Sequence, residues 1–316
     1  MASQEETIKF LQVFEDRFDP AHIENSPVPV TVLGYGEIST VVAFPESAVA
    51  GKAFKRLPLF SSKKEAADYC DLYLEYNRLL RAAGVETPES DGFVVKGKNR
   101  FVAYLSQKQL PAETVGNKVI QTCRPEESLL LLRMVLTRMR ELWEHNTDTL
   151  RLGMDSQISN WSLTGYRPGA PFQATSKLLY LDTSTPFIRK NGIEQMNPLL
   201  FLQSAPPFIR PVLRKFFLQD VMDRFYNFRL TAIDLTANLY KEQKPELIPL
   251  WIEVINKEND DLLQSQPITE KEVKKFYKED KFIWELFLSV RRANRFVNTK
   301  MLGKRYEFTL PGKIKR

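Results

Sequence analysis

An aspartate and an asparagine five residues apart, Asp155 and Asn160, are the side chains of this sequence best suited to chemistry. An aspartate can orient or deprotonate a hydroxyl group, and the amide oxygen of an asparagine can bind a metal ion. The pair follows a long helical segment and precedes the strand-like run 161–164. Such a spacing occurs about once by chance in a chain this long, so its position carries the prediction.

A second carboxylate, Asp182, ends the apolar run Leu178–Leu181, which we interpret as a strand. A carboxylate that enters a loop at the end of a strand can hold Mg²⁺ against phosphate groups. The alternative interpretation is an aspartate that begins a turn.

Two glycines, Gly34 and Gly36, lie in a turn within the Val- and Thr-rich segment 27–44. Backbone amides at glycines can approach phosphate oxygens closely because no Cβ intervenes. Ser39 stands where a third glycine would complete a phosphate-covering loop. The turn joins two predicted strands, unlike Rossmann and Walker loops, which lead into a helix. An ordinary β-hairpin turn is the alternative.

The next predicted strand spans about 50–57 and ends before Pro58, and its lysine Lys55 can reach the phosphates of a nucleotide. Lys52 competes with it, and the odd spacing means that only one of the two faces the cleft, because side chains alternate along a strand. Glu75 lies at the margin of the apolar stripe of the predicted helix 63–83, where it can pair with the strand lysine; Glu65 is a weaker candidate. Each of these residues can also be an ordinary surface group.

In their order along the chain, these features resemble the protein-kinase-like superfamily over roughly residues 28–190. The resemblance implies ATP and Mg²⁺ as cofactors and a catalytic loop between a helix and a strand. The implied roles are Asp155 as catalytic base, Asn160 and Asp182 as Mg²⁺ ligands, Lys55 as phosphate ligand with Glu75 as its anchor, Gly34, Gly36 and Ser39 as the phosphate-covering loop, and Tyr104 in a hinge at 104–107 whose backbone binds adenine.

The chain departs from regulated protein kinases at three motifs. Gly153-Met154-Asp155 replaces His-Arg-Asp, Asp182-Thr183-Ser184 replaces Asp-Phe-Gly, and no Ala-Pro-Glu follows. The resemblance is therefore to a divergent member nearer to aminoglycoside and other small-molecule kinases. It implies transfer of phosphate to a hydroxyl of a small molecule, with Tyr226, Arg229 and Asp234 near the acceptor. A pseudokinase or nucleotide-binding regulatory module, and AMP transfer on the same fold, are the alternatives.

The predicted elements imply an α+β, bilobal protein-kinase-like fold. A small antiparallel sheet lobe carries one inserted helix, and a larger, mainly helical lobe follows. We divide the chain into an N-terminal helical extension (1–26), an N-lobe (27–109) and a helical C-lobe with a basic C-terminal segment (110–316). The helices expected in the C-lobe are 125–144, 195–204, 208–218, 219–241, 245–258, 269–278 and 280–298.

Scarce residues exclude several kinds of site. Two cysteines, Cys70 and Cys123, cannot form a disulfide framework or a Cys-rich zinc site. Two histidines, His22 and His145, cannot form a three-histidine metal site, and no HExxH or GxSxG motif occurs. Any catalysis is therefore expected to use Asp, Asn, Lys and backbone amides, with a hard metal ion.

The positive charge is concentrated at the C-terminus. The chain has 316 residues and a formal net charge of +6, and residues 291–316 hold nine basic residues and one acid. The body is therefore not a nucleic-acid-binding surface, whereas the tail can contact phosphate, RNA or an anionic membrane, or be solvated. The N-terminus does not resemble a signal peptide, and no apolar run is long enough to span a bilayer, so we expect a cytoplasmic protein.

Overall fold

The computed structural model describes residues 2–36, 38–204, 210–213 and 219–310. The helices are α1 (Gln4–Arg17), α2 (Lys63–Ala82), α3 (Gly116–Thr122), α4 (Pro125–His145), α5 (Arg210–Leu213), α6 (Gln219–Arg224), α7 (Phe228–Lys241), α8 (Ile248–Glu258) and α9 (Glu270–Phe296). The strands are β1 (Thr31–Tyr35), β2 (Thr40–Ala43), β3 (Lys52–Phe60), β4 (Ser90–Lys96), β5 (Phe101–Lys108), β6 (Leu150–Leu152), β7 (Trp161–Leu163), β8 (Leu178–Tyr180), β9 (Ile188–Lys190) and β10 (Ile193–Glu194).

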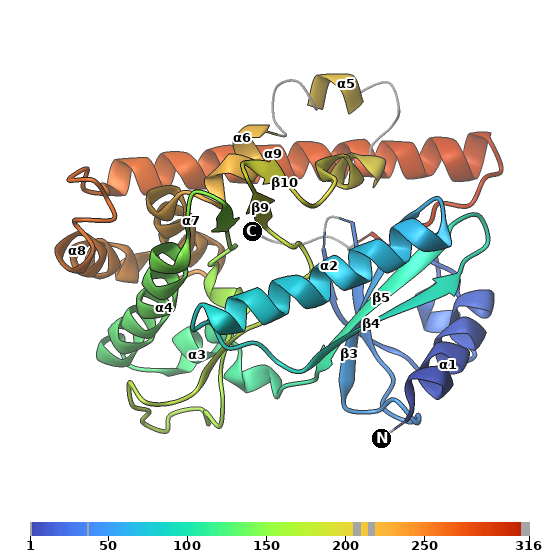
Figure 1. Cartoon of the computed structure of the whole chain (residues 1–316), viewed down its shortest axis with the longest axis horizontal. Coiled ribbons are helices and arrows are strands. Elements are labelled where there is room, and N and C mark those ends of the chain that lie inside the picture. Colours follow the sequence, from blue (N-terminus) through green and yellow to red (C-terminus); the bar gives the residue numbers. More distant parts are fainter. Residues whose placement is uncertain (1, 37, 205–209, 214–218, 311–316) are drawn as a thin grey trace.

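The small lobe is built on an antiparallel sheet in the order β1-β2-β3-β5-β4 (Figure 1). Side chains alternate between the two faces of the sheet along each strand. Phe54 and Tyr104 belong to the core on the α1 face, together with Phe14 of that helix. Ala103 and Leu105 belong to the core on the opposite face, which α2 covers. Each face of the sheet therefore has its own helix.

Helix α2 is fixed at its start by a cap and along its length by a tyrosine stripe. The Ser62 hydroxyl accepts a hydrogen bond from the backbone N–H of Glu65. Tyr69, Tyr73 and Tyr76, spaced four and three residues apart, are buried in the core shared with the sheet. This packing sets the helix across the sheet as the sequence predicts.

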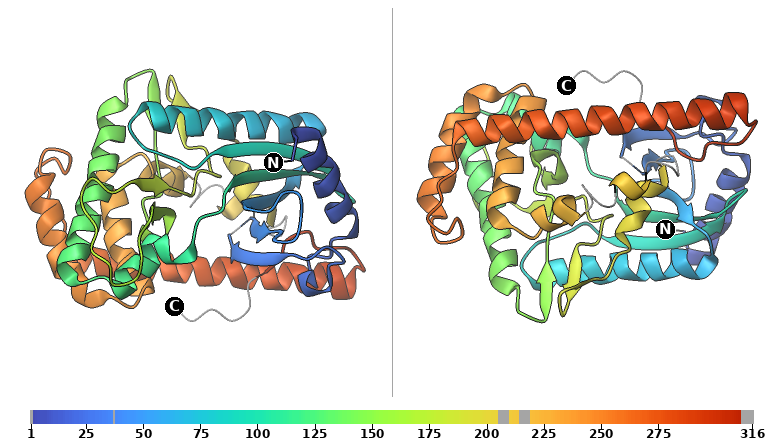
Figure 2. Two further views of the ribbon diagram at one scale, coloured as in Figure 1. Left: turned by 90° about the horizontal axis from the view of Figure 1, so that it is seen from below. Right: turned by 90° about the horizontal axis from the view of Figure 1, so that it is seen from above.

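The larger lobe is mainly helical. Helices α4, α7 and α8 pack on one another, and α9 packs on α7 and α8 and then runs the length of the molecule (Figures 1 and 2). Two small sheets, β10-β9-β6 and β7-β8, are formed by the segment between α4 and α5. The predicted α+β, two-lobed architecture is confirmed. In the described part of the chain, no helix has both the length and the low polarity needed to cross a bilayer.

Some predicted boundaries are wrong. β3 continues through Pro58 to Phe60, because its pairing with β5 shifts between Leu57 and Phe60 and a proline is tolerated at such an irregularity. The predicted helices 269–278 and 280–298 form the single helix α9, since neither proline nor glycine interrupts this stretch.

Some predicted segments fall on residues that are not described. Within the predicted helix 208–218, Arg210–Leu213 forms α5. The rest of that predicted helix lies outside the described residues. The last residues of the basic segment, 311–316, also lie outside.

The chain after α9 returns to the small lobe. The Arg305 guanidinium donates to the carbonyl of Phe18 at 2.7 Å. The Arg56 guanidinium donates to the carbonyl of Glu307 at 2.9 Å. The described part of the basic C-terminal segment is therefore packed on the sheet lobe, where the sequence left a solvated tail open as an alternative.

Candidate functional site

The centre of the candidate site is an ion pair that joins the two lobes. Lys55 Nζ on β3 lies 2.9 Å from Asp182 Oδ1, which follows β8. The hydroxyl of Ser184 hydrogen-bonds the same lysine and donates to Asp182 Oδ1 at 2.8 Å. Lys55 is separated from Asp182 by more than 120 positions in the sequence. The sheet lysine and the strand-end aspartate, both candidate site residues, thus lie together.

The loop that contains Asp155 and Asn160 lies beside this ion pair. The backbone N–H of Leu181 donates to the Asn160 carbonyl at 2.7 Å, and that of Asp155 donates to the Tyr180 hydroxyl at 3.1 Å. Within the loop, Asn160 Nδ2 donates to the Asp155 carbonyl at 3.0 Å. These bonds tie the loop to the residues on either side of the strand end, so Asp155, Asn160 and Asp182 share one region.

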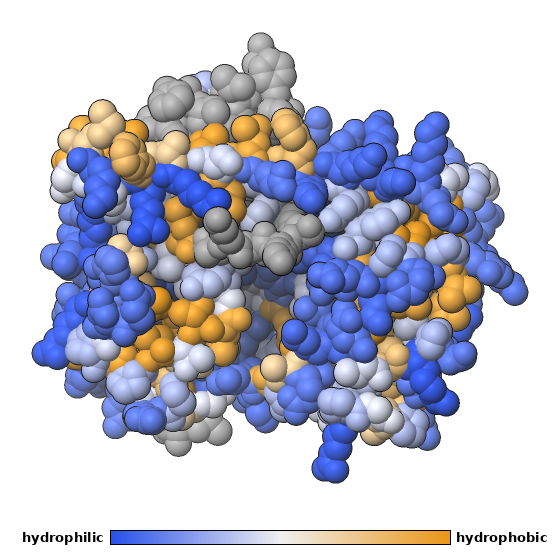
Figure 3. Space-filling view, turned by 180° about the vertical axis from the view of Figure 1, so that it is seen from behind, coloured by the Kyte–Doolittle hydropathy of each residue, from blue (hydrophilic) through white to orange (hydrophobic). Residues whose placement is uncertain are grey.

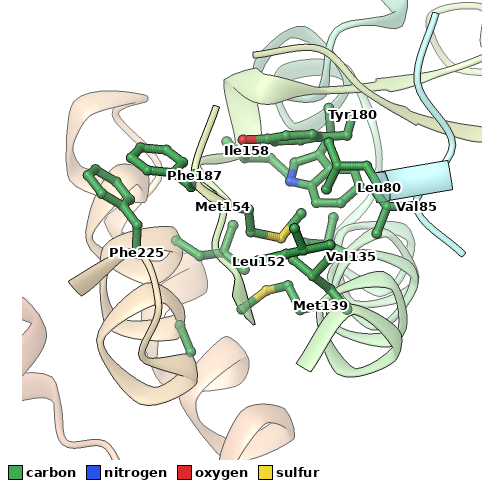
Figure 4. Close-up of a cluster of buried hydrophobic side chains, with 14 of the residues drawn as sticks. Leu80, Val85, Val135, Met139, Leu152, Met154, Ile158, Tyr180, Phe187 and Phe225 are labelled. Atoms are coloured by element: carbon green, nitrogen blue, oxygen red, sulfur yellow. The ribbon is translucent and has the colours of Figure 1, made fainter. Parts of the chain in front are cut away.

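A hydrophobic cluster holds the residues on either side of Asp155 and Asp182 (Figure 4). Leu152 and Met154, which precede Asp155, and Tyr180, which precedes Asp182, are completely buried in it. The polar ends of both segments are consequently held by a packed core, which is how a rigid site is built.

Gly153 fits this core only because it has no side chain. A Cβ on Gly153 would lie 2.5 Å from the carbonyl oxygen of Phe225. The Gly153 carbonyl accepts a hydrogen bond from Tyr76 Oη at 2.6 Å. The Phe225 carbonyl belongs to the backbone and the Tyr76 side chain is completely buried, so neither can easily move away. The glycine just before Asp155 is therefore required by close packing.

We expect Gly153→Ala to lower the free energy of unfolding by about 1–3 kcal/mol, since the backbone at Phe225 must shift to admit a methyl group. Chemical denaturation measures this. Gly34→Ala is the matched control, because its Cβ would meet no atom within 4 Å, and it should change stability by no more than about 0.5 kcal/mol. Equal stability of the two variants would contradict the packing argument.

The two aspartates of the site have opposite electrostatic surroundings. Burial, followed by the nearby carboxylates of Asp234 and Asp182, raises the pKa of Asp155 to about 7. Burial also acts to raise the pKa of Asp182, but Lys55 and the hydrogen bond from Ser184 outweigh it and hold that pKa below its usual value. Asp182 is thus an anion at neutral pH, whereas Asp155 is poised to exchange a proton there.

The glycine turn closes over Lys55. A Cβ on Gly36 would lie 2.6 Å from Ser39 Oγ and 3.8 Å from Lys55 Cε. The Ser39 hydroxyl is buried and has no hydrogen-bond partner among the described residues. Gly34 faces open space. A bare backbone, an unpartnered hydroxyl and a lysine are together a chemically suitable setting for a phosphate group.

Lys55 and Lys52 pair with different aspartates, as the alternation of side chains along a strand requires. Lys52 Nζ lies 2.7 Å from Asp91, far from the pair made by Lys55. Only Lys55 reaches Asp182.

Two predicted site residues are elsewhere. The predicted Glu75–Lys55 pair is wrong in this structure: Glu75 pairs with Lys190 at 2.8 Å, because β9 brings a cation nearer to that face of α2. Tyr104 does not belong to a hinge, since it is central in β5, paired with β3 and β4, and its hydroxyl donates to Glu15 at 2.6 Å. Its backbone is paired with a neighbouring strand on each side.

The comparisons with known proteins add a family and two distant structural likenesses. The model of a family described as "Family of unknown function (DUF6206)" matches residues 19–295. This chain belongs to the DUF6206 family. No curated protein matches it.

The DUF6206 chain is similar to two solved structures. One is WaaP in complex with acyl carrier protein, with 15% identity, a TM-score of 0.37, and coverage of 79% of this chain and 90% of that one. The other is the GDP complex of aminoglycoside 2'-phosphotransferase-IIIa, with 11% identity, a TM-score of 0.34, and coverage of 74% and 93%.

The DUF6206 chain has a protein-kinase-like fold. Its sheet order, the helix inserted between β3 and β4, and the lysine–aspartate pair between lobes carry this assignment. Seen from behind, the molecule is hollowed near its middle, between the sheet lobe and the helical lobe (Figure 3).

Sequence reasoning missed two polar residues of the DUF6206 site. Ser184 bonds both Lys55 and Asp182, and the backbone N–H of Gln157 donates to Asp155 Oδ1 at 3.2 Å. Each stands two residues after the aspartate that it contacts. That spacing is typical of turns capped by an aspartate and was the available signal.

Of the three residues expected near the acceptor, Asp234 forms a hydrogen bond with the loop. Its Oδ1 lies 3.4 Å from Gln157 Nε2. Tyr226 and Arg229 bond carboxylates on β10 and α9 instead.

The residues present in the DUF6206 chain fit a magnesium ion that takes most of its ligands from phosphate and water. Among the described residues, no group of three or more His, Cys, Asp and Glu side chains is gathered for a metal. Mg²⁺ at nucleotide sites commonly needs only one or two carboxylates besides phosphates. Asp182 supplies a carboxylate, and the bond from Asn160 Nδ2 to the Asp155 carbonyl turns the Asn160 amide oxygen away from that carbonyl.

Proposed function

We propose that this protein transfers phosphate from Mg·ATP to a hydroxyl group of a small molecule. The ion pair between Lys55 and Asp182, beside the Asp155–Asn160 loop, is the observation that carries the proposal. A fixed cation from the sheet and fixed oxygen ligands from the helical lobe suit a triphosphate between them, since such catalysis depends on positioning and electrostatics.

Each residue of the site has a chemical task in this proposal. Lys55 would exchange its bond to Asp182 for phosphate oxygens, while Asp182 and Asn160 would hold Mg²⁺. The bound metal would neutralise charge on the phosphates. Asp155 would accept the proton of the acceptor hydroxyl, and its raised pKa suits a group that takes up a proton near neutral pH. Ser39, Gly34 and Gly36 would line the phosphates.

A small polar hollow lies beside the loop that contains Asp155. Its volume is about 20 Å³, so an acceptor would enter only in part or with movement of side chains. Asp234 and Asp280 supply acids, and Lys241 supplies a base. The lining residues are Gln157, Asp234, Ala237, Asn238, Lys241, Phe276, Tyr277 and Asp280.

The test is transfer of label from γ-³²P-ATP to a panel of hydroxyl-bearing metabolites in the presence of Mg²⁺. We expect labelled product together with ADP from the wild-type chain. Release of pyrophosphate with AMP-modified product would replace the proposal by AMP transfer. Absence of any product from a folded protein that binds Mg·ATP would replace it by a nucleotide-binding module.

The second candidate, a nucleotide-binding regulatory module, is favoured by one observation. Glu75 pairs with Lys190, so α2 does not supply the glutamate that anchors the strand lysine in an active kinase-like site. The lysine is bound instead to Asp182 and Ser184.

The pKa of Asp155 predicts the pH dependence of the proposed reaction. Because the base must be ionised, kcat/KM should fall about tenfold per pH unit below about pH 7. Asp234→Asn removes a neighbouring negative charge, which favours the Asp155 carboxylate, lowers its pKa and moves the acidic limb to lower pH. Asp91→Asn, at a carboxylate paired with Lys52, is the control and should leave the limb in place. A limb that Asp234→Asn leaves unmoved, or moves upward, would contradict this assignment.

A further inference from the structure

The end of α9 carries an exposed apolar cluster. Phe296, Val297, Met301 and Leu302 are 60%, 40%, 69% and 55% exposed, and we refer to these four residues as the apolar tip. The tip is an ordered turn, since the backbone N–H of Leu302 donates to the Val297 carbonyl at 3.0 Å. Seen from behind, apolar surface gathers at the upper left, where α9 ends (Figure 3). Contiguous exposed apolar surface of this kind marks an interaction site.

Basic residues surround the apolar tip. The stretch 286–306 contains six basic residues and no acidic one. Arg292, Lys300 and Lys304 in this stretch are exposed, and Arg295 is half-buried. The surface therefore combines large apolar side chains with a single sign of charge.

A cavity of about 400 Å³ opens beside the tip, between the end of α1 and the returning C-terminal segment. Arg17, Lys98, Arg295, Lys304 and Arg305 line it, against one acid, Asp19; Phe18, Ala21, Thr299, Gly303, Tyr306 and Phe308 complete the lining. Arg305 pairs with Glu307 at 3.1 Å, whereas within the described ranges no carboxylate forms an ion pair with the other four cations. Cations gathered without counter-charges make a site for an anion.

A buried arginine adds to the positive potential behind this cavity. Arg291 is almost completely buried, and its guanidinium lies 5.8 Å from the ring of Phe308, a lining residue. Its Nε and Nη2 atoms have no hydrogen-bond partner among the described residues. A buried guanidinium that forms no ion pair with a described carboxylate adds to the attraction for negative charge nearby.

We propose that the apolar tip and the basic cavity together dock the protein on a membrane surface that contains anionic phospholipid. The apolar side chains enter the boundary of the acyl layer, and the cavity receives a headgroup phosphate. An apolar surface alone would suit a protein partner, and a basic cavity alone would suit a free phosphate compound. Their adjacency on one end of the molecule matches the two layers of an anionic lipid interface.

Co-sedimentation of the full chain with vesicles tests the proposal. We expect binding to vesicles of phosphatidylcholine mixed with phosphatidylglycerol, and at least about tenfold weaker binding to phosphatidylcholine alone. Met301→Ser with Leu302→Ser, and separately Arg295→Gln with Lys304→Gln, should each weaken binding to mixed vesicles by about tenfold or more. Unchanged thermal unfolding of these variants confirms that they fold.

Matched controls and a soluble competitor identify the source of the phosphate. Ile193→Ser, at an apolar residue 68% exposed on β10, and Arg151→Gln, at an exposed arginine of β6, should leave vesicle binding unchanged. The proposal is overturned if mixed vesicles do not bind, or if the tip variants bind as the wild type does. It is also overturned if glycerol phosphate binds the cavity in solution while vesicles do not bind, because the ligand is then a free phosphate compound.

Discussion

Asp155→Asn is expected to lower the rate of phosphate transfer by about 10²–10⁴-fold, while the affinity for Mg·ATP changes little. The substitution keeps the size of the side chain and the hydrogen bond that the loop makes through the backbone of Asn160. It removes the ability to accept a proton, which is the role proposed for this carboxylate. The change should therefore appear in kcat, because the lost interaction acts in the transition state.

Turnover measured as ADP release, together with Mg·ATP affinity measured by calorimetry, checks this prediction. Asp148→Asn, at an exposed aspartate in the turn before β6, is the matched control and should retain full turnover. Normal turnover of a folded Asp155→Asn variant would show that this residue is not the base.

Arg56→Met is expected to lower the free energy of unfolding by about 3–5 kcal/mol. Arg56 is 2% exposed, and its guanidinium donates twice to Glu15, at 2.6 and 2.8 Å. Removing the cation leaves the Glu15 carboxylate buried without its counter-charge and also frees the backbone of Glu307. Helix α1 and the C-terminal segment thus lose a shared anchor on the sheet lobe.

Chemical denaturation of two further variants separates this effect from a general loss of packing. The double variant Glu15→Gln with Arg56→Met should be more stable than Arg56→Met alone, because no charge is then left unpaired. Arg133→Met removes an exposed pair with Glu258 and should cost about 1 kcal/mol or less. An Arg56→Met variant as stable as Arg133→Met would contradict the account of the anchor.

Features of the fold with a strong local signal could be predicted from the sequence. The tyrosine stripe at helical spacing predicts α2, and Pro125 with two following acids predicts the start of α4. Two helices are predicted where the structure has the single helix α9, and no proline or glycine within α9 breaks it. The break between α6 and α7 was missed because it depends on Asn227, whose side chain caps α7 by accepting from Leu230.

The site could be predicted in part because some of its residues are positioned by their own elements. Lys55 and Asp182 meet because Lys55 lies on a defined face of β3 and Asp182 comes two residues after the end of β8. Glu75 was assigned the wrong partner because Lys190 comes from a hairpin, β9–β10, whose position no local pattern reveals. Tyr104 was assigned to the hinge although alternation along β5 turns its side chain toward α1, where Glu15 accepts its hydroxyl.

Calorimetric titration of Mg·ATP into the wild-type chain and two lysine variants tests the central claim most directly. We predict that the wild type binds with a Kd on the order of 1 mM or tighter. Lys55→Met should weaken binding by about tenfold or more, because a charge-assisted hydrogen bond to phosphate is lost. Lys52→Met, at the lysine paired with Asp91, should bind as the wild type does. Absence of Mg·ATP binding by the folded wild type, or equal binding by Lys55→Met, would contradict the account.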